Sequence, residues 1–119
     1  MSEQCMWTIE WSDKQISNNA WYQAPHWAVR SKNKNDWRAF FTPLIKQAGV
    51  PLLPQYRLLL EFNSRLDPSN TIAMVKLFED TLKNVGLIHD DSKKYCKGII
   101  VEPNDDLPSK TYRITLFKV

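Results

Sequence analysis

The chain has 119 residues, which is enough for one hydrophobic core and too few for two, so we expect residues 1–119 to form a single domain. Its 43% hydrophobic and 24% charged residues are typical of a soluble globular protein, and its apolar runs are far too short for a membrane span. The start of the chain has neither the basic nor the apolar region of a secretory signal, so we expect a cytoplasmic protein with reduced thiols.

The formal net charge of +3 is modest, but the basic residues are clustered. Residues 30–38 contain Arg30, Lys32, Lys34 and Arg38, opposed only by Asp36. A second cluster consists of Lys93, Lys94 and Lys97. Basic groups near carboxylates suit a protein that both holds and cuts an anionic polymer. Either cluster alone equally fits a solvated surface.

The first half of the chain predicts a strand, a loop and a helix. Aromatic or β-branched residues alternate with polar ones over Trp7–Trp11, which is typical of a strand. Residues 17–27 have no clear period and predict an ordered loop rich in aromatic side chains. A helix is expected next, capped by Asn33 or Asn35 and stopped by Gly49.

The second half predicts a strand, a helix and two more strands. The nearly continuous apolar run Tyr56–Phe62 is typical of a strand buried on both faces. A helix is expected from about Asn70 to Asn84, where Gly86 ends an amphipathic pattern. Strands at about Tyr95–Val101 and Thr111–Phe117 complete an α+β domain, with a mixed sheet of about four strands packed with two helices.

Acidic residues flank this second helix. Asp67 precedes it, and Asp90 and Asp91 follow it, just before a strand. Carboxylates from separate elements can meet at one edge of a sheet and share Mg²⁺, which takes oxygen ligands. Glu61, near the end of the preceding strand, either joins such a cluster or points to solvent. The alternative is structural, because Asp67–Asn70 is good helix-entry chemistry and an Asp-Asp-Ser sequence is good turn chemistry.

Other kinds of chemistry find little support. His26 and His89 are the only histidines, which excludes a His-rich metal site, and no nucleophilic Ser or Cys triad is apparent. Three glycines do not make a phosphate-binding loop, so we expect no small-molecule cofactor.

Three stretches keep the order and spacing of a known family. Ser17-Asn18-Asn19 and Tyr22 lie in the N-terminal half, and Asp67-Pro68-Ser69-Asn70 forms an acidic entry to the second helix. The third stretch has one ungapped spacing through Lys76, Asp80, Leu82, Gly86, Asp90 and Asp91. In these residues the chain resembles the RusA-like endodeoxyribonucleases, the Holliday-junction resolvases typical of bacteria and their prophages.

The resemblance implies a homodimer that binds branched DNA and resolves a four-way junction by paired nicks. Each protomer would hold Mg²⁺, for which Mn²⁺ could substitute, on Asp67 and Asp91, with Asp90 as a neighbour. The family's functional lysine corresponds to Lys76, whose alternative role is a surface pair with Asp80. Further site candidates are Asn18, Asn19 and Asn70. The expected DNA-binding residues are Arg30, Lys32, Lys34, Arg38 and Lys76.

Ser69 departs from the family pattern, because the second acid of the family's entry motif stands at this position. The loss removes one formal charge from a site whose affinity for a dication depends on charge. The Asn70 oxygen, Glu61 or water could fill the position. Otherwise the protein binds junctions but cuts them poorly. A third alternative is an RNA-binding module that uses its many aromatic residues to stack bases.

Overall fold

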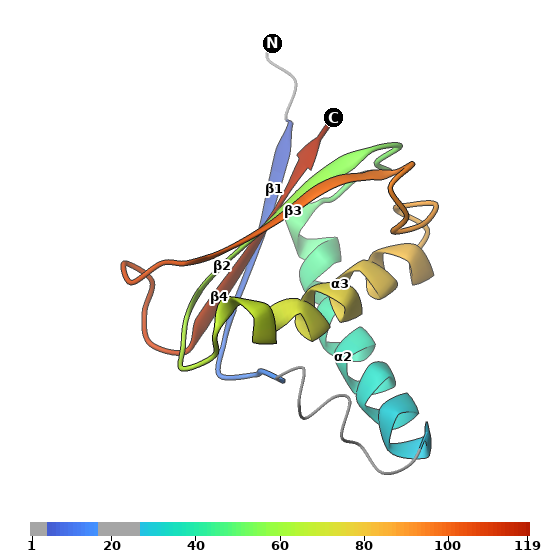
Figure 1. Ribbon diagram of the computed structural model, residues 1–119. Coiled ribbons are helices and arrows are strands. Elements are labelled where there is room, and N and C mark those ends of the chain that lie inside the picture. Colours follow the sequence, from blue (N-terminus) through green and yellow to red (C-terminus); the bar gives the residue numbers. More distant parts are fainter. Residues whose placement is uncertain (1–4, 17–26) are drawn as a thin grey trace.

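Four strands form one mixed sheet in the computed structural model, which describes residues 5–16 and 27–119, without the side chains of residues 27–30 (Figure 1). The strand order is β1 (Met6–Ser12), β4 (Thr111–Lys118), β2 (Tyr56–Asn63) and β3 (Cys96–Pro103). Strand β4 is antiparallel to both of its neighbours, whereas β2 and β3 are parallel. Parallel strands need a crossover, which here is the 3₁₀ helix η1 (Pro68–Thr71) followed by α3 (Ile72–Asn84).

The core lies between one face of this sheet and two helices, α2 (Trp27–Ala48) and α3. Alternate residues of three strands are buried on that face, as the period of a strand requires: Trp7, Ile9, Trp11, Tyr56, Leu58, Leu60, Phe62, Tyr112, Ile114 and Leu116. The helices contribute Trp37, Phe41, Ile45, Val75, Phe78 and Leu82. The expected α+β arrangement of four strands and two helices is confirmed. None of the described helices is long and apolar enough to span a membrane.

Two expectations about individual elements are wrong. Strand β2 is not buried on both faces, because both helices pack on one side and leave Arg57 exposed and Glu61 half-buried on the other. Helix α2 begins at Trp27, so Asn33 and Asn35 lie within it rather than at its cap. Residues 27–35 contain no proline or glycine, so the sequence places no helix breaker between Trp27 and the two asparagines.

The entry to α3 matches the expected position but uses a different contact. Asp67 has an extended backbone and precedes η1, yet its side chain makes no capping hydrogen bond. Pro68 has no N–H to satisfy, and the Thr71 hydroxyl donates to the Pro68 carbonyl oxygen at 2.7 Å. The Asp67 side chain is exposed, and its carboxylate oxygens do not cap the helix.

Candidate functional site

The acids that flank α3 lie at opposite ends of the helix. Asp67 follows the end of β2, whereas Asp90 and Asp91 precede the start of β3, which runs parallel to β2. The 13-residue α3 between them is about 20 Å long. The expectation that these acids share one edge of the sheet is therefore wrong for a single protomer. In a parallel crossover, the second strand begins at the end of the sheet opposite to the end where the first strand stops.

Asp90 and Asp91 sit in a turn that is held against the last turns of α3. Lys83 Nζ lies 3.2 Å from an Asp90 carboxylate oxygen. The backbone N–H of Asp91 also bonds to that carboxylate, and these contacts lower the pKa of Asp90 below its ordinary value. Asp91 itself is exposed. The turn thus carries two adjacent carboxylates, of which Asp90 is paired with Lys83 and Asp91 is exposed.

Glu79 lies buried beneath this turn, with only 2% of its surface exposed. The Tyr56 hydroxyl donates a hydrogen bond to Glu79 Oε2, and the half-buried Cys96 thiol contacts the same pair. Burial raises the pKa of Glu79 above its ordinary value, and the charge of Asp91 raises it further. The Tyr56 bond and the charge of Lys76 act in the opposite direction. Residues from β2, α3, β3 and the turn are therefore electrostatically coupled at one point.

The sequence analysis did not single out Glu79 as a site residue. Its spacing was the available signal, because Glu79 lies four residues after Val75 and three before Leu82, on the apolar stripe. A carboxyl at a stripe position is rarely buried without a partner, and Tyr56 supplies one.

Lys76 is exposed, and it does not form the surface pair with Asp80 that was its alternative role. The two Asp80 carboxylate oxygens instead contact Arg38 at 2.7 Å and Lys34 Nζ at 3.3 Å. Burial opposes the ionisation of Asp80, but these two cations outweigh it and lower its pKa. The surface-pair explanation for Lys76 therefore fails within the described part of the chain, and the exposed Lys76 side chain instead acts electrostatically on Glu79.

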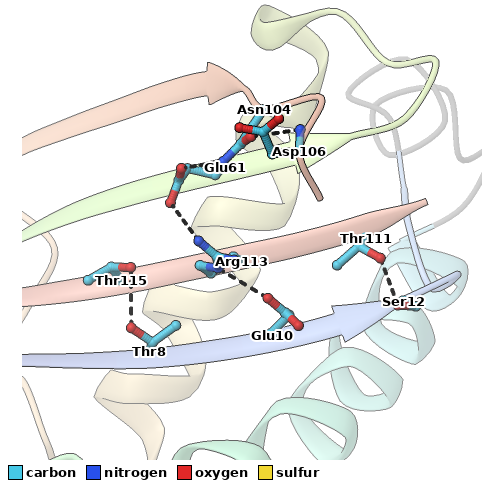
Figure 2. Close-up of polar contacts among 9 residues, drawn as sticks. All are labelled: Thr8, Glu10, Ser12, Glu61, Asn104, Asp106, Thr111, Arg113 and Thr115. Atoms are coloured by element: carbon cyan, nitrogen blue, oxygen red, sulfur yellow. Dashed lines mark hydrogen bonds and ion pairs between the residues drawn. The ribbon is translucent and has the colours of Figure 1, made fainter. Parts of the chain in front are cut away.

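Glu61 does not join an acidic cluster. Figure 2 shows it on the uncovered face of the sheet, within a row of cross-strand contacts. Arg113 Nη1 lies 3.6 Å from Glu61 Oε1, and Asn104 Nδ2 donates to Glu61 Oε2 at 2.8 Å. Arg113 also pairs with Glu10 at 3.1 Å. Glu61 is thus a structural partner on the face opposite α3.

The remaining site candidates are dispersed. Ser69 is exposed within η1, and the Asn70 N–H donates to the Asp67 carbonyl oxygen at 2.9 Å. Asn18 and Asn19 lie outside the described residues. In the first basic cluster, Lys34 and Arg38 are engaged by Asp80, Lys32 is exposed, and Arg30 is in α2 but its side chain is not described. Lys93, Lys94 and Lys97 are all exposed near the Asp90 turn.

Within residues 5–16 and 27–119, no three His, Cys, Asp or Glu side chains converge to hold a metal ion. Asp90 and Asp91 supply two adjacent carboxylates, and Mg²⁺ often uses one or two carboxylates and keeps several waters. No protein-family model matches the chain, and neither does any curated protein.

Proposed function

We propose that the protein is a Mg²⁺-dependent endodeoxyribonuclease that acts on four-way DNA junctions as a cytoplasmic homodimer. The observation that supports the proposal is that Lys76 and Asp91 each interact electrostatically with one buried carboxyl, that of Glu79. The two residues come from a helix and from the turn after it. They are also the residues that the resemblance to RusA-like nucleases pairs in one site.

The chemistry follows from these groups. A bound Mg²⁺ would polarise a phosphoryl oxygen or lower the pKa of an attacking water. Asp90 and Asp91 would hold it through carboxylate oxygens. Lys76 would contact the scissile phosphate and stabilise the negative charge that develops on it. The exposed lysines 93, 94 and 97 would hold the flanking phosphates.

Asp67 can join this site only from a second protomer. In one chain it is separated from Asp91 by the length of α3. A two-fold axis that places the α3 helices of two protomers antiparallel would bring Asp67 of each next to Asp91 of the other. Such an arrangement creates two equivalent sites, as paired nicks require.

The test is incubation of the full-length protein with a labelled four-way junction, with Mg²⁺, with Mn²⁺ and without metal. We expect paired symmetric nicks only with metal. Asp91→Asn should abolish the nicks but retain the mobility shift, because it removes a metal ligand and reduces repulsion of DNA phosphates. Asp105→Asn is the matched control, since it removes an exposed carboxylate from the loop between β3 and β4.

The second candidate is a non-cleaving junction-binding protein, favoured by the neutral Ser69 in place of an acid. It predicts a mobility shift without nicks at any metal concentration. The RNA-binding alternative loses part of its basis, because Trp7, Trp11 and Trp37 are buried in the core and cannot stack on bases.

A further inference from the structure

A polar pocket of about 550 Å³ lies at the end of the sheet where β2 terminates. Three separate segments form it: the chain after β1, the end of β2 and the turn before β4, which meet at one end of the sheet (Figure 1). Its described lining consists of Gln15, Asn63, Ser64, Arg65, Ser109 and Lys110. Asp67 follows this lining by two residues, and none of the residues assigned to the nuclease site lines the pocket.

The walls of this pocket are fixed by hydrogen bonds. Asn63 Nδ2 donates to the Leu107 carbonyl oxygen at 2.7 Å, and the Lys110 N–H donates to the Asn63 carbonyl oxygen at 2.6 Å. Lys110 is held in the left-handed region, with φ 58°, and its carbonyl oxygen accepts the Asp13 N–H at 2.9 Å. The three segments are thus tied together by backbone contacts, so the pocket does not depend on a bound molecule to form.

Gln15 is oriented by a buried partner. The Tyr112 hydroxyl donates to Gln15 Oε1, which leaves the side-chain NH₂ of Gln15 to donate elsewhere. The Ser109 hydroxyl adds a further group that can donate, whereas the Ser64 hydroxyl is bonded to Tyr112 and accepts the Leu66 N–H at 3.3 Å.

The charge of the pocket is positive and unbalanced. Its described lining has two cations, Arg65 and Lys110, and no carboxylate. Within the described part of the chain, neither cation takes part in an ion pair, whereas Arg38, Lys83 and Arg113 are each paired with an acid. Guanidinium and ammonium groups next to hydroxyl and amide donors match an oxyanion with several acceptor oxygens.

We propose that this pocket binds a phosphate group of a nucleic-acid backbone, with Arg65 and Lys110 as its cationic contacts. The volume exceeds that of a bare phosphate ion and can admit the attached sugar as well. Only the assignment of this phosphate to a nucleic acid rests on the proposed function. The preference for a phosphorylated ligand rests on the pocket itself.

The first arm of the test uses ¹⁵N-labelled full-length protein titrated with inorganic phosphate, against chloride at equal ionic strength. Saturable amide shifts are expected at Ser64, Arg65, Ser109 and Lys110. Arg65→Gln and Lys110→Asn should each abolish saturation. Both positions are exposed, and asparagine tolerates the left-handed backbone at 110. Lys46→Gln, which removes an exposed cation at the C-terminal end of α2, should bind phosphate like the parent.

The second arm measures binding of a labelled junction as a function of salt for the same variants. Arg65→Gln and Lys110→Asn should each lower the salt slope by about 1, as expected for one lost phosphate contact. Lys46→Gln should leave the slope unchanged.

The two arms separate the possible failures. An absence of saturable shifts with phosphate would overturn the pocket as a phosphate site, whatever the junction does. Saturable shifts combined with parental salt slopes would overturn the nucleic-acid source and point to a small phosphorylated ligand. If the parent protein binds no junction at all, the proposed function fails and the nucleic-acid source fails with it, while the phosphate arm still decides the pocket.

Discussion

Glu79 shows how a single buried residue connects the core with the candidate site. Its carboxyl is hydrogen-bonded to Tyr56 inside the protein, and it also responds to the charges of Asp91 and Lys76 at the surface. A buried carboxyl with a raised pKa favours its neutral form, so ionisation at neutral pH costs folding free energy.

Glu79→Gln should therefore stabilise the protein at neutral pH. Glutamine keeps an oxygen that can accept the Tyr56 hydrogen bond and has no charge to bury. Since the folded-state pKa of Glu79 lies above the ordinary 4.5, the variant and the parent should be equally stable below pH 4.5. The advantage should appear as the pH rises through the raised pKa of Glu79. Urea unfolding at a series of pH values measures it. A variant less stable than the parent at pH 8 would show that the ionised carboxylate is needed.

Ser69→Asp tests whether the missing acid weakens the metal site. Ser69 is exposed in η1, near the N-terminus of the helical segment, where a negative charge is favoured, so little stability should be lost. The variant should need less Mg²⁺ for half-maximal cleavage of a labelled junction, or acquire cleavage if the parent has none. Ser31→Asp makes the same change at an exposed position of α2 and should not alter the Mg²⁺ requirement. No gain at any Mg²⁺ concentration would mean that another group already completes the site.

At the level of elements, α2 and α3 are joined by a clamp on their polar sides. Asp80 of α3 holds Arg38 and Lys34 of α2, in addition to the apolar contacts of Phe41 with Phe78. Asp80 thereby engages Lys34 and Arg38, two cations that were expected to bind DNA.

Asp80→Asn should release this clamp. We expect a loss of about 1 kcal/mol or less in the free energy of unfolding, as is usual for partly exposed ion pairs. Because the pKa of Asp80 is lowered in the folded state, the loss should be present near neutral pH and vanish as the pH falls through that pKa. Junction binding should tighten, since Lys34 and Arg38 become free to contact phosphates. Asp36→Asn, an exposed acid on α2, is the control, and an equal effect from it would contradict a specific clamp.

At the level of the whole molecule, the separation of Asp67 from Asp91 determines how a nuclease site can be completed. The parallel pairing of β2 with β3 requires the crossover through α3, and the crossover carries the two acids to opposite ends of the strands. If both are metal ligands, each site needs two protomers.

Mixed dimers of Asp67→Asn and Asp91→Asn distinguish a shared site from a site within one protomer. Each variant alone should form an inactive homodimer. A heterodimer purified through two different tags would combine intact Asp67 from one protomer with intact Asp91 from the other, and should nick one strand of the junction. An inactive heterodimer would place each site within one protomer, and an active Asp67→Asn homodimer would exclude Asp67 as a ligand.

Apart from the start of α2, the helices and strands could be recognised from sequence patterns alone. Residues that alternate or recur at helical spacing bury one face of each strand and helix, so the local pattern was enough to predict four strands, two helices and the α+β class. The acidic turn at Asp90 and Asp91 and the entry at Asp67 were also visible, because turn and helix-entry chemistry is local.

Which of these residues meet depends on how the elements pack against one another. Strand order and direction separate Asp67 from Asp91, place Glu61 with Arg113 on the open face and gather Arg65 and Lys110 at one pocket. The physical reason is that contacts between distant elements depend on how the sheet is paired, whereas sequence periodicity reports only the face that each element buries. For Glu79, the sequence shows its position on the apolar stripe of α3, but its partner Tyr56 is known only from the folded structure.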